Sequence, residues 1–429
     1  MTMAADKQDK VLNFSSEREQ SGTCSSSAER EKNQGKNFLN VPTLRFPEFS
    51  GEWKESTIGK EFELYSGNTP SRLDKENYVG DVNWITSGEL KDHYIGDTKE
   101  KISEKSAKEN NLRLLPEGTF VIAIYGLEAE GVRSTGSIIT KQSTISQACM
   151  AFTPKGDITN EFLYSWYKKH GNVIGIRYAQ GTKQQNLSYD ILEKFKIRYP
   201  SLKEQDKLNS FISLLDTRIA TQIRIIEDFK SLSDVICERL YTPSEKESWK
   251  TYKYTDLFSI SNDRNSKIQY TNVLSASQEY GIIERNELNI DIKFEAASIA
   301  NYKIVRPNQY VIHLRSFQGG FAYSDKTGVC SPAYTILVPN EKLSTAFLKY
   351  YFTSKKFIDS LRIVTYGIRD GRSISVEEFL QLKVAIPDIT RQQHIVRVMQ
   401  LWEEKIKTEE SYLSKLQQQK KYLLSTMFI

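Results

Sequence analysis

The chain has 429 residues, of which 39 % are hydrophobic and 26 % charged, and its formal net charge is +5. This length exceeds one compact core, so two globular domains with connecting segments are expected. The mild positive charge permits a polyanionic partner but does not require one. The four cysteines lie far apart and form no C-x-x-C pair, which argues against a zinc site and against a disulfide framework.

Two further classes are disfavoured by the pattern of apolar residues. No apolar run approaches the roughly 20 residues that span a bilayer, and no signal-peptide core is present. We therefore expect a cytoplasmic protein. Residues 1–40 are dominated by Lys, Glu, Gln and Ser, which predicts a flexible N-terminal extension because such a segment buries little apolar surface.

The first globular domain is expected over residues 41–200. Short apolar runs between Gly, Asn and Pro predict strands, and periodic runs after Asn160 and Ser188 predict helices. This mixture indicates an α+β fold. The expected strands are 82–85, 118–125, 136–139 and 148–152, and the expected helices are 160–170 and 189–194.

The second globular domain is expected over residues 243–388 and repeats the same plan. Strands are predicted near 270–275, 309–314 and 333–338, and a helix is predicted over 344–357. A further helix is expected to begin at Ser375.

Two long amphipathic runs, residues 201–242 and 389–429, are predicted to form helices of about 35 residues and about 50 Å each. Apolar residues recur at steps of three and four, so each helix has a seam that requires a partner. The two seams can pack together as one long coiled coil, which their similarity to each other favours, or each can pack on its own globular half. The expected helix–helix packing residues are Ile212, Leu215, Ile219, Ile226, Ile395, Trp402, Ile406, Leu413 and Leu416.

An offset of 187 residues relates these two regions to each other. Four matches at this offset pair Pro200 with Pro387, Gln205 with Gln392, Ile219 with Ile406 and Leu240 with Met427. A repeat of this kind predicts two similar halves, each a globular region followed by one long helix.

Motifs of catalytic proteins are mostly absent. The sequence has no phosphate-binding loop, no dinucleotide-binding turn and no H-E-x-x-H helix. Pro387-Asp388 followed by Glu403 and Lys405 matches the letters of a Mg²⁺-dependent nuclease motif. However, Glu403 and Lys405 lie two residues apart in a predicted helix and therefore on different faces. No catalytic residue, metal ligand or cofactor is predicted.

Two polar loops occupy matching places in the two halves, each directly before a short helix. Residues 178–188 contain Lys183, Gln184 and Gln185, and residues 365–375 contain Arg369 and Arg372. Lys, Arg and Gln are residue types that hydrogen-bond base edges, and the neighbouring glycines allow close approach to phosphate. Such loops are usually only loops, but their recurrence in a duplicated chain favours a role in DNA binding.

With these features the chain closely resembles the specificity subunit of type I restriction-modification systems, over about residues 41–429. The resemblance rests on the segment 41–49 with Trp53, and on the form G-x5-L-S-x-x-x-L-x-x-(F/L)-K-(I/V)-x-x-P-x4-Q. This form occurs twice, with one extra residue in the second copy between Gly367 and Ser375. Its residues are Gly181, Leu187, Ser188, Leu192, Phe195, Lys196, Ile197, Pro200 and Gln205, and then Gly367, Ile374, Ser375, Phe379, Leu382, Lys383, Val384, Pro387 and Gln392.

The resemblance implies two α+β target-recognition domains, separated by two long helices that pack as an antiparallel coiled coil. Each domain would read one half of a split double-stranded DNA target, and the helices would set the gap between the half-sites. It also implies two methyltransferase (modification) subunits as partners, with motor-nuclease (restriction) subunits joining for cleavage. Residues 1–40 have no counterpart in the family pattern.

The two globular halves differ from one another elsewhere, which indicates an asymmetric target. The first has 67–70 and 84–90, whereas the second has the dissimilar segments 273–278 and 315–320. For DNA contacts we expect first the five loop residues named above, and then Thr69, Ser87, Lys91, Arg315 and Gln318. The function predicted is sequence-specific DNA recognition without catalysis by this chain. Two alternatives remain: a single-chain nuclease or methylase, which turnover by the isolated chain would identify, and a coiled-coil scaffold that binds proteins.

Overall fold

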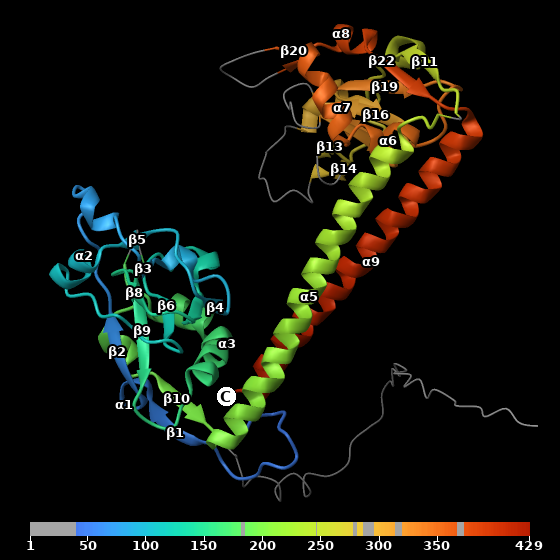
Figure 1. Ribbon diagram of the computed structural model, residues 1–429. Helices are drawn as coiled ribbons and strands as arrows, with labels where there is room; N and C mark the ends of the chain where they lie inside the picture. The colour runs from blue at the N-terminus through green and yellow to red at the C-terminus, as the bar shows by residue number, and fades with distance from the viewer. Residues whose placement is uncertain are drawn as a thin grey trace, which may run out of the picture. The chain divides into compact units, whose positions relative to one another are not determined.

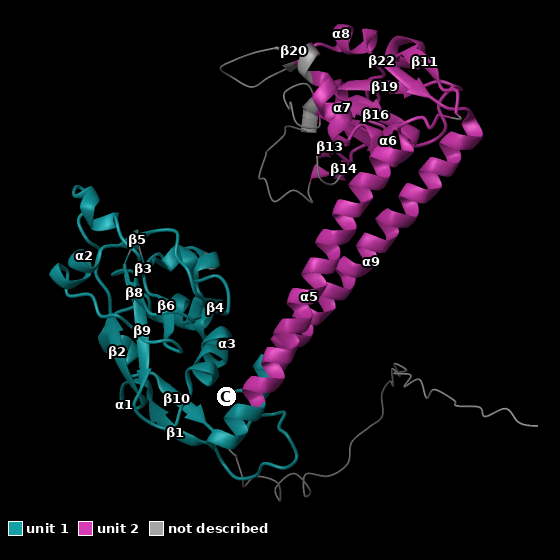
Figure 2. Cartoon of the chain, in the orientation of Figure 1, with its two compact units in different colours: residues 1–207, 424–429 teal, residues 208–423 magenta. Residues whose placement is uncertain are grey.

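The structure is a computed structural model that describes residues 40–181, 185–245, 247–277, 281–285, 296–313, 320–366 and 373–429. The chain divides into two compact units (Figure 2). Unit 1 comprises the described residues up to Lys207 together with Leu424–Ile429, and unit 2 comprises Leu208–Leu423. The last six residues of the chain are therefore part of the first unit.

Unit 1 is an α+β half built on a five-stranded sheet with the order β2-β9-β6-β7-β4 and a three-stranded sheet with the order β5-β3-β8. A third pair, β1 with β10, lies beside the start of the long helix α5 (Figure 1). The elements are β1 (Lys54–Thr57), α1 (Ile58–Glu61), β2 (Phe62–Ser66), β3 (Val82–Ile85), β4 (Tyr94–Ile95), β5 (Lys101–Ile102), α2 (Glu104–Glu109), β6 (Phe120–Ala123), β7 (Gly136–Ile139), β8 (Ser143–Ile145), β9 (Cys149–Pro154), α3 (Asn160–Tyr178), α4 (Tyr189–Leu192), β10 (Lys196–Tyr199) and α5 (Leu202–Leu240).

The central strand β6 shows why the run 118–125 is apolar without alternation. All four of its residues are buried because both faces of the strand are covered. Phe120 contacts Tyr164 and Tyr167 of α3, with ring centroids 6.0 and 5.9 Å apart. Val121 and Ala123 belong to a second buried cluster with residues of the neighbouring strands.

Unit 2 repeats the plan with a four-stranded sheet, β12-β19-β16-β17, and with the pair β11-β22 in the place of β1-β10. Three further two-stranded sheets are β13-β14, β15-β18 and β20-β21. The elements are β11 (Lys250–Lys253), β12 (Phe258–Ser261), β13 (Leu274–Ser277), β14 (Gly281–Glu284), β15 (Lys303–Val305), β16 (Gln309–Ile312), β17 (Phe321–Ser324), β18 (Gly328–Cys330), β19 (Thr335–Pro339), α6 (Phe347–Tyr351), α7 (Lys355–Ser360), β20 (Thr365–Tyr366), β21 (Ser373–Ile374), α8 (Val376–Gln381), β22 (Lys383–Ile386) and α9 (Ile389–Met427).

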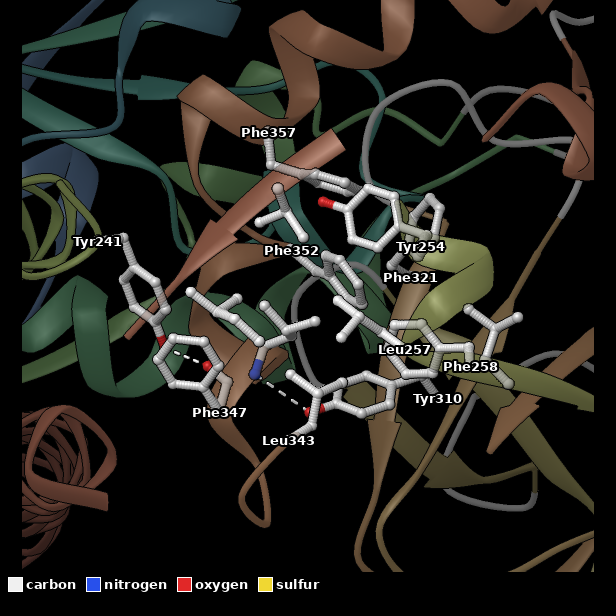
Figure 3. Close-up of a cluster of buried hydrophobic side chains, with 14 of the residues drawn as sticks. Tyr241, Tyr254, Leu257, Phe258, Tyr310, Phe321, Leu343, Phe347, Phe352 and Phe357 are labelled. Carbon is white, nitrogen blue, oxygen red and sulfur yellow. Dashed lines mark hydrogen bonds between the residues drawn. The ribbon is translucent and has the colours of Figure 1, made fainter. Parts of the chain in front are cut away.

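The single helix predicted over 344–357 is in fact two short helices, α6 and α7. The hydroxyl of Ser354 accepts a hydrogen bond from the backbone N–H of Phe357 and starts α7 as an N-cap. The aromatic residues of both helices still face one core, in which the rings of Phe352 and Phe357 lie 4.6 Å apart (Figure 3). The apolar residues recur with the helical period, as predicted, but the N-cap at Ser354 divides the segment into two helices.

The helices α5 and α9 each contain 39 residues, which is about 58 Å at 1.5 Å per residue. Within unit 2 they lie side by side and antiparallel (Figure 1). Phe229 packs edge-on against Trp402 at 5.9 Å, and further along Lys420 pairs with Asp216 at 2.5 Å. All nine residues predicted at the helix interface are buried or half-buried, and Ile395 lies in the aromatic core of the second half.

The helix pair has a local two-fold relationship. The 187-residue offset makes Gln222 the counterpart of Glu409, and these two residues meet each other across the pair. The amide Nε2 of Gln222 donates to Glu409 Oε2 at 2.6 Å. Two equivalent positions contact each other where a two-fold axis passes between the helices. The repeat in the sequence therefore relates α5 to α9 by a local pseudo-two-fold axis at this point.

A buried glutamine ties the start of each long helix to the globular half that precedes it. Gln205 Nε2 donates to the carbonyls of Pro200 and Asp157, and its Oε1 accepts from the backbone N–H of Thr159. Gln392 makes the same three bonds, to Pro387 and Lys342 and from Ser344. Both side chains are fully enclosed, at 0 % and 1 % exposed.

The residue directly after each long helix packs on a buried phenylalanine of its own unit. Tyr241, directly after α5, packs on Phe347 at 5.1 Å in unit 2. Phe428, directly after α9, packs on Phe162 at 5.3 Å in unit 1. Lys169 also donates to the carbonyl of Phe428 at 2.6 Å. Both contacts lie within a single unit and fix the end of the helix there.

A tryptophan, a carboxylate and a guanidinium meet at the start of each half. In unit 1 the carboxylate belongs to the helix: Glu204 of α5 accepts from the indole of Trp53 and forms a bidentate pair with Arg45 at 2.7 Å.

In unit 2 the acid and the base are exchanged. Glu247 lies just before β11 and accepts from the indole of Trp249 at 3.1 Å. The guanidinium now belongs to Arg391 of α9, 3.1 Å away. Both halves thus have the same kind of ion pair, but the helix contributes the acid in unit 1 and the base in unit 2.

The glutamine bridge predicts a clear difference between two neighbouring residues. Gln392→Ala should lower the free energy of unfolding by about 2–4 kcal/mol, because it leaves buried backbone groups without partners. The exposed neighbour Gln393 provides the control, and Gln393→Ala should change stability by less than about 0.5 kcal/mol. Urea unfolding followed by circular dichroism measures both variants. Equal midpoints for the two would contradict this account of the bridge.

Candidate nucleic-acid interface

The first candidate DNA-contacting loop is closed at its base by an antiparallel backbone pair. The N–H of Gln180 donates to the carbonyl of Asn186, and the N–H of Asn186 donates back, both at 2.8 Å. Gly181 has a φ of +122°, a conformation that L side chains rarely adopt, so the turn out of Gln180 requires glycine. Lys183 and Gln184 lie outside the described residues, and Gln185 is half-exposed.

The same loop is fastened to the sheet through its C-terminal end. The N–H of Leu187 donates to the carbonyl of Ile124, directly after β6, and Leu187 itself is buried. The carbonyl of Gln185 accepts from the N–H of Leu127, and the N–H of Gln185 donates to the carboxylate of Glu128 at 2.9 Å. Both backbone polar groups of Gln185, its N–H and its carbonyl, are therefore hydrogen-bonded to this neighbouring loop.

The corresponding segments of unit 2 are closed in a similar way. Thr365 pairs with Ile374 and Tyr366 with Ser373, so β20 and β21 bracket the segment 367–372. His313 donates from its N–H to the carbonyl of Gly320 at 2.6 Å, and this bond brackets the segment 314–319. The predicted contact residues in these two segments lie outside the described residues: Arg369 and Arg372, and Arg315 and Gln318.

Thr69 follows a turn that needs a glycine. A Cβ on Gly67 would lie 1.8 Å from the carbonyl oxygen of Ile145, so no other residue fits there without displacing β8. The carbonyl of Asn68 accepts from the indole of Trp84 at 3.2 Å, which fixes the segment directly before Thr69.

Ser87 and Lys91 flank a short turn after β3. Glu89 closes this turn by accepting from the backbone N–H of Thr86 at 3.0 Å. Lys91 is exposed, and Ser87 is half-exposed.

A series of backbone hydrogen bonds links the segments next to three of the described candidates in unit 1. Ser146 donates to the carbonyl of Ile85, directly before the turn with Ser87, and Asn68 donates to the carbonyl of Ile145. The N–H of Ile124 donates to the carbonyl of Ala148, and the carbonyl of Ile124 accepts from Leu187, in the loop with Gln185. Thr69, Ser87 and Gln185 therefore each lie within two residues of a backbone group in this series, which runs through the turn between β8 and β9.

The letters of the nuclease motif are not a catalytic cluster. Glu403 pairs with Lys349 at 2.6 Å and with Lys407 at 2.9 Å, whereas Lys405 pairs with Glu409. Hydrogen bonds from the two lysines outweigh partial burial, and the pKa of Glu403 falls to about 2. Asp388 accepts from the N–H of Arg391 as a helix cap. Among the described residues, no group of His, Cys, Asp and Glu could hold a metal ion.

No helix among the described residues is both long and apolar enough to cross a membrane. The long helices α5 and α9 carry charged residues along most of their length instead.

The sequence profile of the type I restriction modification DNA specificity domain matches this chain twice, over residues 50–228 and 246–418. The chain therefore belongs to this family. The two matched ranges correspond to the two halves of the repeat, each with its globular region and most of its long helix.

Relatives with established names have the same designation. The chain is 26 % identical over 209 residues to the type I restriction enzyme MjaIX specificity subunit of Methanocaldococcus jannaschii, an alignment that covers 48 % of this chain and 47 % of the relative. It is 26 % identical over 184 residues to the EcoR124I/EcoR124II specificity subunit of Escherichia coli, covering 42 % of this chain and 45 % of the relative. The alignments thus span about half the length of the curated relatives.

Solved structures share the fold over nearly the whole chain. The S subunit of the type I restriction-modification system from M. genitalium superposes with a TM-score of 0.51 at 16 % identity, covering 91 % of this chain and 99 % of that one. A chain from the structure that describes complex assembly and conformational transition of the type I R-M system gives 0.59 at 12 % identity, covering 89 % and 98 %. The fold class predicted from the sequence is confirmed.

Reasoning from the sequence missed the loop 125–133, which supports the candidate site in unit 1. Arg133 donates from Nε to the carbonyl of Leu127 and from Nη2 to that of Glu128, at 2.7 and 3.0 Å. Its signal in the sequence is weak, because Glu128 is acidic, whereas DNA contacts are expected from basic and amide side chains. Glycines on both sides, at 126 and 131, were the feature that could have marked it as a loop.

The contact at Gly67 generates a prediction about the segment with Thr69. Gly67→Ala should lower the free energy of unfolding by about 1–3 kcal/mol, because the added methyl group overlaps the backbone of β8. A Cβ on Gly88, in the neighbouring turn, would have nothing within 4 Å, so Gly88→Ala is the matched control and should be neutral. Thermal unfolding measures the stability of both variants. A Gly67→Ala variant as stable as the wild type would contradict the steric conflict inferred at Gly67.

Proposed function

We propose that this chain is the sequence-specifying subunit of a type I restriction-modification complex. Each globular half reads one part of a bipartite, asymmetric double-stranded DNA target, and methyl transfer and cleavage belong to partner chains. The observation that carries this proposal is the twofold match to the DNA specificity domain, together with the names of the relatives. Closed polar loops at equivalent places in the two halves support it.

DNA contacts are proposed at the loops that the structure brackets. The candidates are Lys183, Gln184 and Gln185 in the first half and Arg369 and Arg372 in the second, followed by Thr69, Ser87, Lys91, Arg315 and Gln318. Loops whose flanking residues are fixed by backbone hydrogen bonds on a packed sheet can present side chains to a groove. The divergence between the two halves supports an asymmetric target.

Two methyltransferase subunits are proposed to dock on the long helices, and motor-nuclease subunits to join that complex. The support lies in exposed apolar residues that recur at the 187-residue offset. Leu214 of α5 corresponds to Leu401 of α9, and these are 70 % and 49 % exposed. Val235 corresponds to Tyr422, at 45 % and 61 % exposed. The same surface presented twice fits two copies of one partner.

The experiment that tests this function maps methylated adenines in host cells with and without the chain, with the methyltransferase kept constant. We expect one asymmetric, interrupted motif to lose its methylation when the chain is deleted. An unchanged methylation pattern, with the methyltransferase active through another specificity chain, would contradict the proposal and favour the scaffold. Methylation or cleavage by the isolated chain would favour the single-chain enzyme instead.

The docking surfaces predict a stepwise loss of partners. The variant with Leu214→Glu should bind one methyltransferase subunit instead of two, and the double variant with Leu401→Glu should bind none. Each lost leucine contact should cost about 1.5–3 kcal/mol. Size-exclusion chromatography with light scattering measures the stoichiometry.

The control for docking is Leu232→Glu. Leu232 is 45 % exposed on α5, but its counterpart at the same offset is the polar Gln419. A full complement of partners on the double variant, or an equal loss from Leu232→Glu, would rule out these surfaces.

A further inference from the structure

Glu128 stands out on the candidate interface because it is acidic where DNA phosphates are expected. Its carboxylate accepts the backbone N–H of Gln185 at 2.9 Å, and the N–H of its neighbour Leu127 donates to the carbonyl of Gln185 at 3.0 Å. Two adjacent residues of one loop thus hold both polar groups of a single residue in another loop. Gln185 is the described member of the first candidate base-contacting set.

The loop that carries Glu128 is itself anchored to the longest helix of the globular half. Arg133 donates to the carbonyls of Leu127 and Glu128, and its side chain passes over Gly175 of α3. A Cβ on Gly175 would lie 2.9 Å from Cγ of Arg133, so this glycine leaves the room that the arginine occupies. A continuous path therefore runs from α3 through Arg133 and Glu128 to Gln185.

A neutral oxygen could also accept from the N–H of Gln185, so the hydrogen bond alone does not require the negative charge of Glu128. The pKa of Glu128 lies below its usual range, chiefly because the N–H of Gln185 stabilises the carboxylate, and the group is ionised at neutral pH. A fixed negative charge beside phosphates weakens attraction to any DNA, regardless of its sequence. Hydrogen bonds to the correct bases must then compensate for the repulsion.

We propose that Glu128 is a positioning residue for DNA recognition: its carboxylate fixes the backbone of Gln185, and its charge disfavours binding to DNA without the target sequence. This inference rests on the proposed function, since it concerns the same surface. It assigns two separable effects to one side chain, and these effects are distinguished by substitutions that remove the charge alone or the charge together with the acceptor.

The test measures the affinity of the full chain, in complex with its methyltransferase partner, for a duplex with the mapped target and for a scrambled duplex. Glu128→Gln keeps an oxygen acceptor and removes the charge, so target binding should stay within about twofold while scrambled-DNA binding tightens about threefold. Glu128→Ala removes both, so target binding should also weaken about tenfold.

Glu117 provides the matched control. It is an exposed acid of the same globular half, but it lies before β6, at the opposite end of that strand from Glu128. Glu117→Ala should change neither affinity. Hydrogen exchange gives a second readout: the amide of Gln185 should exchange faster in Glu128→Ala and at the wild-type rate in Glu128→Gln.

The outcomes separate this inference from the function on which it rests. A wild-type complex that binds both duplexes equally overturns the proposed function and this inference with it. A wild-type complex that discriminates, with Glu128→Ala discriminating equally well, overturns the inference alone. Scrambled-DNA binding that rises as much in Glu117→Ala as in Glu128→Gln also overturns it, because the effect would then reflect net charge and not position.

Discussion

Each long helix depends at its first turn on one buried glutamine that bridges three backbone groups of the preceding globular half. An amide side chain can do this because it donates and accepts at once, and enclosure makes every unpaired backbone group costly. Gln205 and Gln392 therefore fix both the position and the direction in which α5 and α9 leave their halves. Aromatic contacts also hold the far ends of the two helices, where Tyr241 packs on Phe347 and Phe428 packs on Phe162.

Much of this architecture could be predicted because its causes are periodic or repeated. The helix pair follows from apolar steps of three and four, and the two halves follow from a constant offset that includes Gln205 and Gln392. The break between α6 and α7 could not be predicted in this way. Its cause is a single cap at Ser354, and the aromatic residues on both sides of the cap continue the helical period because they face one shared core.

The candidate site was predictable in its kind and only partly in its members. Residue types suited to base edges pointed to the loop with Gln185, and the structure brackets that loop by backbone pairing at Gln180 and Asn186. The supporting loop was not predicted, because Glu128 binds the backbone N–H of Gln185, which lies more than fifty residues away in the sequence. Contacts of this kind depend on tertiary structure and leave no local pattern.

The exchanged polarity of the two tryptophan-centred ion pairs determines which parts of this chain can be recombined. A segment with Arg45 placed against α9 would bring its guanidinium to that of Arg391, and a segment with Glu247 placed against α5 would face Glu204. The segment with Arg45 is thus compatible only with α5, and the segment with Glu247 only with α9. A chimera with a new specificity must therefore be joined inside the globular half, after Trp53 or Trp249, so that segment and helix are inherited together.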